Sequence, residues 1–240
     1  MSRYQRGVRI WHIPLDPGPA VVARCLDLLD DAERAQLSRV ASPELARRYA
    51  VAHGAVREVL GALVSAGPAG LRYRTGQWGK PELDGYPGVH HNLSHSDELA
   101  LLAVSADQAV GVDVERLRPS LRGARALADR YFLPAEARAV ARRPAADQPW
   151  WYQRFWTRKE ACGKVYGVPL VVALRFGVHG QTVPAPVDGD RGRAAEPVGA
   201  APSQRSPCRL VDVTTEPGYL AAVAMLGVGP YQVHHHRWPR

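Results

Sequence analysis

"HHNLSHSDELALLAVS", residues 90–105, is the stretch that decides the fold of this chain. It predicts a strand, a polar turn near residues 96–98 and a second strand, which together form a β-hairpin. A second hairpin is predicted at residues 208–226, "CRLVDVTTEPGYLAAVAML", around a Pro-Gly turn. The last strands of the two hairpins, "ELALLAVS" and "YLAAVAML", resemble each other. The chain is therefore expected to contain the same small antiparallel unit twice.

A long helix is predicted ahead of each hairpin. The first follows Ser42, a good N-cap, has Pro43 at the first helical position, and runs to the break "SAGPAG" at residues 65–70. The second is the aromatic stretch "DQPWWYQRFWTRKEACGKVYG" (residues 147–167), which ends at its C-terminal glycine. Another helix is predicted over residues 25–40, where apolar residues recur at helical spacing.

A helix followed by a hairpin thus occurs twice, and this order predicts an α+β fold. We expect two related halves, residues 1–107 and 108–240, each with helices packed on a small, mostly antiparallel sheet. A cleft between two such halves is a natural ligand site. Residues 184–207, rich in Pro, Gly, Ala and charge, are predicted to form a mobile surface loop.

The composition is that of a soluble globular protein, with 46% hydrophobic and 22% charged residues. The three cysteines, Cys25, Cys162 and Cys208, lack the spacing of metal ligands and predict reduced thiols. The N-terminus has no apolar signal core, and the longest apolar stretch, residues 219–229, is too short to span a bilayer. The sequence therefore predicts a cytoplasmic protein that has no membrane partner.

The net charge of +8 and the pI of about 9.7 favour anionic partners: nucleic acid, a phosphorylated small molecule or an acidic protein. Part of the excess can instead reflect a genome-wide bias towards Ala, Arg, Gly and Pro. The arginines are scattered, and no helix-turn-helix, zinc-finger or aromatic RNA-binding signature is present in the sequence. Both observations argue against nucleic acid as the partner.

The segment "GVDVE", residues 111–115, carries two carboxylates. Side chains alternate along a strand, so Asp113 and Glu115 are expected to point to one face while Val112 and Val114 point to the other. Two carboxylates on one face, roughly 6–7 Å apart, can converge on a hard cation such as Mg²⁺. The alternative is that both acids lie on the solvated face of an edge strand.

The aromatic helix adds a third carboxylate and two lysines. Its relevant residues recur at helical spacing and share one stripe: Trp156, Lys159, Glu160, Gly163 and Lys164. The alternative is an ordinary surface Glu–Lys pair, worth about 0.2–0.5 kcal/mol. Lysine is rare here, with three among 31 basic residues, and this rarity favours its use as a compact point charge for a phosphate or a leaving oxygen. We interpret Gly163 as making room beside Glu160.

Two further segments carry groups that can bind phosphate. Ser94 and His95 supply a hydroxyl and an imidazole, and the third lysine, Lys80, lies in "WGKP", where Gly79 and Pro81 fix a local bend. A Ser-His pair can also indicate a hydrolase. However, neighbours in a strand point to opposite faces, and no nucleophile elbow surrounds Ser94.

In chain order, "GKPEL", "HNLSHS", "GVDVE" and "FWTRKEACGK" resemble the signatures GKP, (F/N)NxSHS, GxDxE and WxxKEAxxK of the 4′-phosphopantetheinyl transferases. The chain is most similar to the long, monomeric, Sfp-like type, and the resemblance covers residues from about 24 to 228. It implies a pseudo-twofold pair of α+β halves with coenzyme A bound between them. Enzymes of this type modify carrier proteins of polyketide, nonribosomal peptide and fatty acid synthesis.

The resemblance also implies roles for single residues. Asp113, Glu115 and Glu160 would hold Mg²⁺ on the coenzyme A pyrophosphate, and Lys164 would contact the pyrophosphate and assist the departing phosphate. The other implied contacts with coenzyme A are Ser94 and His95 at the phosphates, Gly79, Lys80 and Pro81 near the adenine, Arg48 or its rival Arg47 at the 3′-phosphate, and Lys159. For Lys159, a partly structural role is the alternative.

In the expected reaction, a serine of an apo carrier protein attacks the β-phosphate of coenzyme A and 3′,5′-ADP leaves. Glu160 takes the serine proton, directly or through a metal-bound water, while Asp113 and Lys164 complete the catalytic group. Carrier proteins are generally acidic, so the positive net charge would speed encounter. By the same resemblance we expect a monomer.

Two other functions stay open at this point. A Mg²⁺-dependent phosphohydrolase of nucleotides needs the same acids but no protein acceptor. A non-catalytic basic module that binds nucleic acid or an acidic protein would use the arginines and leave the acids idle.

Overall fold

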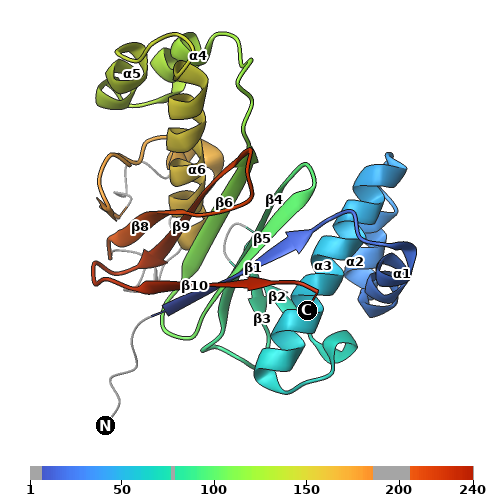
Figure 1. Ribbon diagram of the computed structural model, residues 1–240. Helices are drawn as coiled ribbons and strands as arrows, with labels where there is room; N and C mark the ends of the chain where they lie inside the picture. Colours follow the sequence, from blue (N-terminus) through green and yellow to red (C-terminus); the bar gives the residue numbers. More distant parts are fainter. Residues whose placement is uncertain (1–6, 77–78, 186–205, 240) are drawn as a thin grey trace.

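The computed structural model describes residues 7–76, 79–185 and 206–239 (Figure 1). The strands in this part are β1 (Gly7–Pro14), β2 (Tyr73–Thr75), β3 (Pro81–Leu83), β4 (His90–Ser96), β5 (Leu99–Ser105), β6 (Val110–Arg116), β7 (Thr182–Val183), β8 (Cys208–Val213), β9 (Tyr219–Leu226) and β10 (Gln232–Arg237). The helices are α1 (Pro19–Leu28), α2 (Asp31–Leu37), α3 (Pro43–Val64), α4 (Ala124–Tyr131), α5 (Pro134–Ala141), α6 (Gln148–Tyr166), α7 (Leu170–Ala173) and a short 3₁₀ helix (Pro68–Gly70).

These strands form two four-stranded sheets and one two-stranded sheet. The first has the order β10-β1-β5-β4, the second has the order β6-β9-β8-β7, and β2 pairs with β3. Each pair is antiparallel except β1 with β10, which is parallel. The predicted α+β class, with small and mostly antiparallel sheets, is confirmed.

The two larger sheets pack face to face, and one long helix covers the outer face of each (Figure 1). Alternation along the strands explains this layering. Leu101 of β5 joins Val112 of β6 and Val223 of β9 in the core between the sheets, whereas its neighbour Leu102 packs in the cluster that contains α3. The other face of the second sheet packs on α6, where Phe155 is fully buried.

The order of elements repeats. Strand, helix and hairpin follow one another as β1, α3, β4–β5 and again as β6, α6, β8–β9, and in both cases the first strand pairs with the last. Strand β10, from the end of the chain, adds to β1 and so joins the first sheet. The boundary near residue 107 stays a prediction.

The ends of the long helices follow the sequence signals. The Ser42 side chain accepts a hydrogen bond from the Leu45 N–H at 3.4 Å, and α6 ends at Gly167, whose φ of 66° is left-handed. The single helix predicted over residues 25–40 is wrong. The chain breaks between α1 and α2, because Asp30 and Glu33 form a capping box that starts a new helix.

Most of the predicted loop at 184–207 lies outside the described residues, which omit 186–205. Within the described ranges, each helix is too short or too polar to cross a bilayer.

Candidate active site

Strand β6 presents two different faces. Val112 and Val114 are buried in the core between the sheets, and Asp113 on the opposite face is 4% exposed. The predicted alternation is confirmed, and the alternative in which the acids sit on a solvated strand face is wrong for Asp113. The reason is tertiary: α6 packs against β6, and β4 lies along its free edge.

Asp113 is the centre of a small polar cluster. The Nζ atom of Lys164 lies 2.6 Å from Asp113 Oδ1 and 2.9 Å from Ser94 Oγ. The Ser94 hydroxyl donates to the same carboxylate oxygen at 2.8 Å. Burial nevertheless raises the pKa of Asp113, against the opposing pull of Lys164. The structure thus brings together three of the predicted site residues from β4, β6 and α6.

The second carboxylate oxygen of Asp113 finds no partner in the described part of the chain. Oδ2 is buried, and it makes no hydrogen bond there. A buried acceptor left unsatisfied costs about 1–3 kcal/mol, so a bound cation or donor would relieve a real penalty.

Glu115 and Glu160 lie near enough to Asp113 to feel its charge. Burial, and then the Asp113 carboxylate, raise the pKa of each of these two glutamates. Glu115 accepts a hydrogen bond from the Ser96 hydroxyl at 2.9 Å. Three carboxylates therefore share one region in which the opposing charges are Lys164 and, for Glu115, Arg118. This excess of negative charge favours a bound cation.

The three carboxylates do not form a preassembled metal site in the described part of the chain. Among the described residues, no three His, Cys, Asp or Glu side chains stand close enough to hold a metal ion by themselves. The orphaned Asp113 oxygen and the excess of carboxylates still fit Mg²⁺, because this ion takes only one or two carboxylates and completes its shell with water and substrate phosphates.

Gly111 allows the close approach of β6 to α6. A Cβ atom at this position would lie 2.3 Å from the Ala161 carbonyl oxygen and 2.6 Å from the Val165 nitrogen. Only glycine fits such a contact. Gly163 has a different role from the one we predicted. Its missing Cβ makes room for Ala173 of α7, whose Cβ would lie 2.6 Å away, and not for Glu160.

Lys159 does not reach this cluster. It is fully buried, its Nζ lies 2.6 Å from the Glu136 carboxylate, and it also donates to the carbonyl oxygens of Leu174 and Phe176. The predicted contact with coenzyme A is therefore corrected to a core ion pair. The physical reason is helical rotation: five residues turn a helix by about 140°, so Lys159 and Lys164 leave α6 on different faces.

A cavity of about 450 Å³ lies on the α3 side of β4. It is lined by the predicted coenzyme A contacts Gly79, Pro81 and His95, together with Tyr73 and His53. Burial, helped by the charge of Lys164, lowers the pKa of His95 and so disfavours its charged form. Ser94 and His95 thus lie on opposite faces of β4, and the charges of Lys164 and Asp113 still act on His95.

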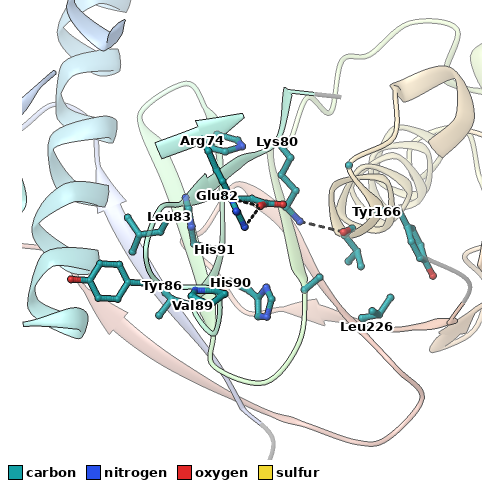
Figure 2. Close-up of a pocket in the computed structure, with 15 residues that line it drawn as sticks. Arg74, Lys80, Glu82, Leu83, Tyr86, Val89, His90, His91, Tyr166 and Leu226 are labelled. Atoms are coloured by element: carbon teal, nitrogen blue, oxygen red, sulfur yellow. Dashed lines mark hydrogen bonds and ion pairs between the residues drawn. The ribbon is translucent and has the colours of Figure 1, made fainter. Parts of the chain in front are cut away.

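A second cavity, of about 310 Å³, lies between the β2–β3 hairpin and the end of α6 (Figure 2). Lys80 extends across it, and its Nζ donates to the carbonyl oxygens of Val110, Lys164 and Val165 at 3.0, 2.6 and 3.2 Å. Burial lowers the pKa of Lys80 to about 8. The ammonium ties the hairpin to α6 and β6, and the position of Lys80 near the adenine stays a prediction.

Comparison with known proteins identifies the family. The model of the 4′-phosphopantetheinyl transferase superfamily matches residues 109–193. The 4′-phosphopantetheinyl transferase HetI of Nostoc sp. is 30% identical over 226 residues, which cover 92% of this chain and 89% of HetI. The 4′-phosphopantetheinyl transferase Sfp of Bacillus subtilis is 26% identical over 202 residues, 83% of each chain. This chain belongs to the 4′-phosphopantetheinyl transferase family.

The resemblance read from the four motifs is thereby confirmed. The matched range of the transferase family contains Asp113, Glu115, Glu160 and Lys164. The match thus covers β6 and α6, the two elements that Gly111 holds in close contact.

Arg48 is less available to this transferase's substrate than predicted. Its Nη2 lies 2.9 Å from Asp16, 2.8 Å from Glu44 and 3.8 Å from Glu98. Its rival Arg47 binds Asp16 at 2.7 Å. A phosphate at Arg48 would compete with three carboxylates, and the 3′-phosphate contact stays a prediction.

Sequence reasoning missed two residues that shape the site, and a third that fixes Lys159 in the core. Asn92 and Ser96 bind β6, and Glu136 neutralises Lys159. For Asn92 and Ser96 the signal was present, because both share the strand face of Ser94. For Glu136 the only signal was its place in the first turn of a helix, where an acid is ordinarily a surface residue.

Proposed function

We propose that this transferase moves the 4′-phosphopantetheine group from coenzyme A to a serine of an apo acyl or peptidyl carrier protein and releases 3′,5′-ADP. The observation that carries the proposal is the cluster of Asp113, Ser94 and Lys164, with Glu115 and Glu160 beside it and an unsatisfied Asp113 oxygen at its centre. Family membership indicates that phosphopantetheine is the transferred group. The charges of the cluster are suited to bind a pyrophosphate.

The bond changes follow from the chemistry of the donor. The serine oxygen forms a bond to the β-phosphorus of coenzyme A, and the phosphoanhydride bond to the α-phosphate oxygen breaks. Lys164 is suited to the leaving oxygen, since an ammonium is a compact charge and this side chain is 27% exposed. Its present partner Asp113 keeps the ammonium oriented until substrate arrives.

Glu160 is the proposed acceptor of the serine proton. Burial and the charge of Asp113 raise the pKa of Glu160, and a carboxylate with a raised pKa is a stronger base near neutral pH. No other carboxylate of α6 is placed beside this cluster in the described residues.

We propose that Asp113, Glu115 and Glu160 supply the carboxylates for Mg²⁺, one or two of them directly and the rest through water. When bound, the ion would neutralise charge on the pyrophosphate oxygens. The cavity lined by His95, Gly79 and Pro81 is the proposed place for the nucleotide end of coenzyme A.

The carrier is proposed to be acidic, because the net charge of +8 favours encounter with a negative partner. Nucleic acid and membranes are not proposed partners. A monomer in the cytoplasm also remains a proposal.

The test is to incubate the protein with coenzyme A, Mg²⁺ and several apo carrier proteins and to weigh each carrier. We expect one added phosphopantetheine on a serine and an equal amount of 3′,5′-ADP. If every carrier keeps its mass, the proposal is wrong. Nucleotide hydrolysis without a carrier would favour a phosphohydrolase, and carrier binding that survives EDTA without turnover would favour a binding module.

Glu160→Gln sharpens this assay. If Glu160 is the base, turnover falls by roughly 10²-fold or more. Turnover close to that of the wild type would remove Glu160 from this role.

A further inference from the structure

Strand β4 carries a row of polar side chains that face β6. Asn92, Ser94 and Ser96 are two residues apart and therefore share one face of the strand. In the β4–β5 register, Ser94 and Ser96 lie opposite Leu101 and Leu99, which face the core between the sheets. His95 points the other way, into the cavity on the α3 side.

These three side chains take the place of a backbone ladder between β4 and β6. The amide of Val112 donates to Asn92 Oδ1 at 2.8 Å, that of Val114 to Ser94 Oγ at 3.4 Å, and that of Arg116 to Ser96 Oγ at 3.0 Å. The opposite edge of β6 pairs with β9. The row thus satisfies backbone donors of β6 that would otherwise be buried without acceptors.

The two serines have a second role that Asn92 lacks. Each hydroxyl accepts from one β6 amide and donates to the carboxylate of the residue just before that amide. Ser94 donates to Asp113 at 2.8 Å, and Ser96 donates to Glu115 Oε2 at 2.9 Å. The same small motif therefore occurs twice, once for each acid of β6.

The two acids depend on their serines to different degrees. Asp113 has Lys164 as a further partner at 2.6 Å. For Glu115, Ser96 is the only hydrogen-bond donor among the described residues. Ser96 is itself 8% exposed and fixed from both sides, by the Arg116 amide and by the Glu115 carboxylate.

We infer that Ser96 is a positioning residue for Glu115 and thereby for the cation that Glu115 would hold. The inference rests on the proposed function, and it goes beyond it by assigning a residue that contacts neither substrate nor metal. Partners that orient a ligating carboxylate typically change metal affinity 10- to 100-fold when they are removed.

The test measures metal binding directly, by titrating wild type and Ser96→Ala with Mn²⁺ in the presence of coenzyme A and following free Mn²⁺ by electron paramagnetic resonance. We expect Ser96→Ala to weaken Mn²⁺ binding by about 10-fold or more. Ser96→Thr, which restores the hydroxyl, is expected to recover most of this loss. Ser96→Cys, which keeps the volume but donates weakly, gives the same comparison if the alanine variant is unstable.

Ser105→Ala is the matched control. Ser105 is 1% exposed in the same hairpin, and its hydroxyl accepts from the amides of Asp107 and Gln108. We expect this variant to lose stability like Ser96→Ala but to keep wild-type Mn²⁺ affinity. Equal Mn²⁺ affinity of wild type and Ser96→Ala would overturn the role of Ser96 alone. A wild type that binds no Mn²⁺ would overturn the metal site itself together with it.

Discussion

Lys159 and Lys164 leave the same helix five residues apart and end in opposite environments. The Lys159 ammonium is fully buried, and Glu136 and two carbonyl oxygens take its three N–H donors. The Lys164 side chain is 27% exposed and has two acceptors among the described residues, Asp113 and Ser94. A lysine whose N–H donors are all bound by protein acceptors stabilises the fold. A partly exposed lysine, in a cluster where a buried carboxylate oxygen lacks a hydrogen bond, can still bind a ligand.

Removing the buried charge should have the largest effect on stability. Lys159→Met leaves the Glu136 carboxylate, which is 1% exposed, without its ion-pair partner. We expect the free energy of unfolding to fall by about 3–5 kcal/mol. Urea denaturation followed by tryptophan fluorescence measures this change.

The double variant Lys159→Met/Glu136→Leu is the control, because replacing a whole buried pair with apolar residues is often neutral. A loss below about 1 kcal/mol in the single variant, as for a surface pair, would contradict the structural role of Lys159.

Removing the charge at the cluster should act on the rate. Lys164→Ala is expected to lower kcat by roughly 10²–10³-fold, as for other groups that stabilise transition-state charge. Lys164→Arg should restore it only in part, because a planar guanidinium does not replace a compact ammonium. The carrier-mass assay gives both rates. Full activity of Lys164→Ala would mean that Lys164, like Lys159, has no direct role in the reaction.

Two glycines at packing contacts of α6 separate stability from rate. Gly111→Ala places a methyl group 2.3 Å from the Ala161 carbonyl oxygen, and such overpacking costs about 1–3 kcal/mol. Because the clash pushes β6 away from α6, the Asp113–Lys164 contact lengthens and turnover should fall as well.

Gly163→Ala is the matching change at a position that, like Lys159, contacts the core and not the Asp113 cluster. Its new methyl meets Ala173 of α7 at 2.6 Å, so we expect a loss of thermal stability with kcat near that of the wild type. Equal loss of turnover in both variants would mean that the close contact between β6 and α6 has no special importance for turnover.

Lys80 is the intermediate case, and its effect on stability is expected at alkaline pH. Burial lowers its pKa to about 8 in the folded protein, against about 10.4 in an unfolded chain. Between these pH values the unfolded chain holds a proton that the folded chain has released, so the free energy of unfolding rises with pH.

Lys80→Met lacks this dependence. We therefore expect the wild type to gain stability relative to Lys80→Met as the pH is raised from about 8 to about 10. Urea titrations of the two proteins across that range measure the difference. A difference that stays constant, or that falls with pH, would contradict the buried position of the ammonium.

The sequence was sufficient for features with a local signal. Alternation placed Asp113 opposite Val112, and a serine N-cap placed the start of α3. The four motifs identified the family. Each of these depends on residues a few positions apart in the chain, which local periodicity and capping rules describe.

The features that were missed depend on distant contacts. Lys159 was placed at the site because its partner Glu136, 23 positions earlier, gives no sign of burial in the sequence. Gly163 was assigned to Glu160 because only the fold brings Ala173 to it. Alternation places Ser96 on the strand face of Ser94, but its function requires the contact between β4 and β6, which the local pattern does not show.

The carrier-mass assay on wild type, Lys164→Ala and Lys159→Met/Glu136→Leu, each shown to be folded, tests the central claim most directly. The account predicts that wild type and the double variant load phosphopantetheine onto an apo carrier at similar rates, while Lys164→Ala is slower by roughly 10²-fold or more. Loading by Lys164→Ala at the wild-type rate, or loss of loading in the folded double variant, would contradict the division between the two lysines.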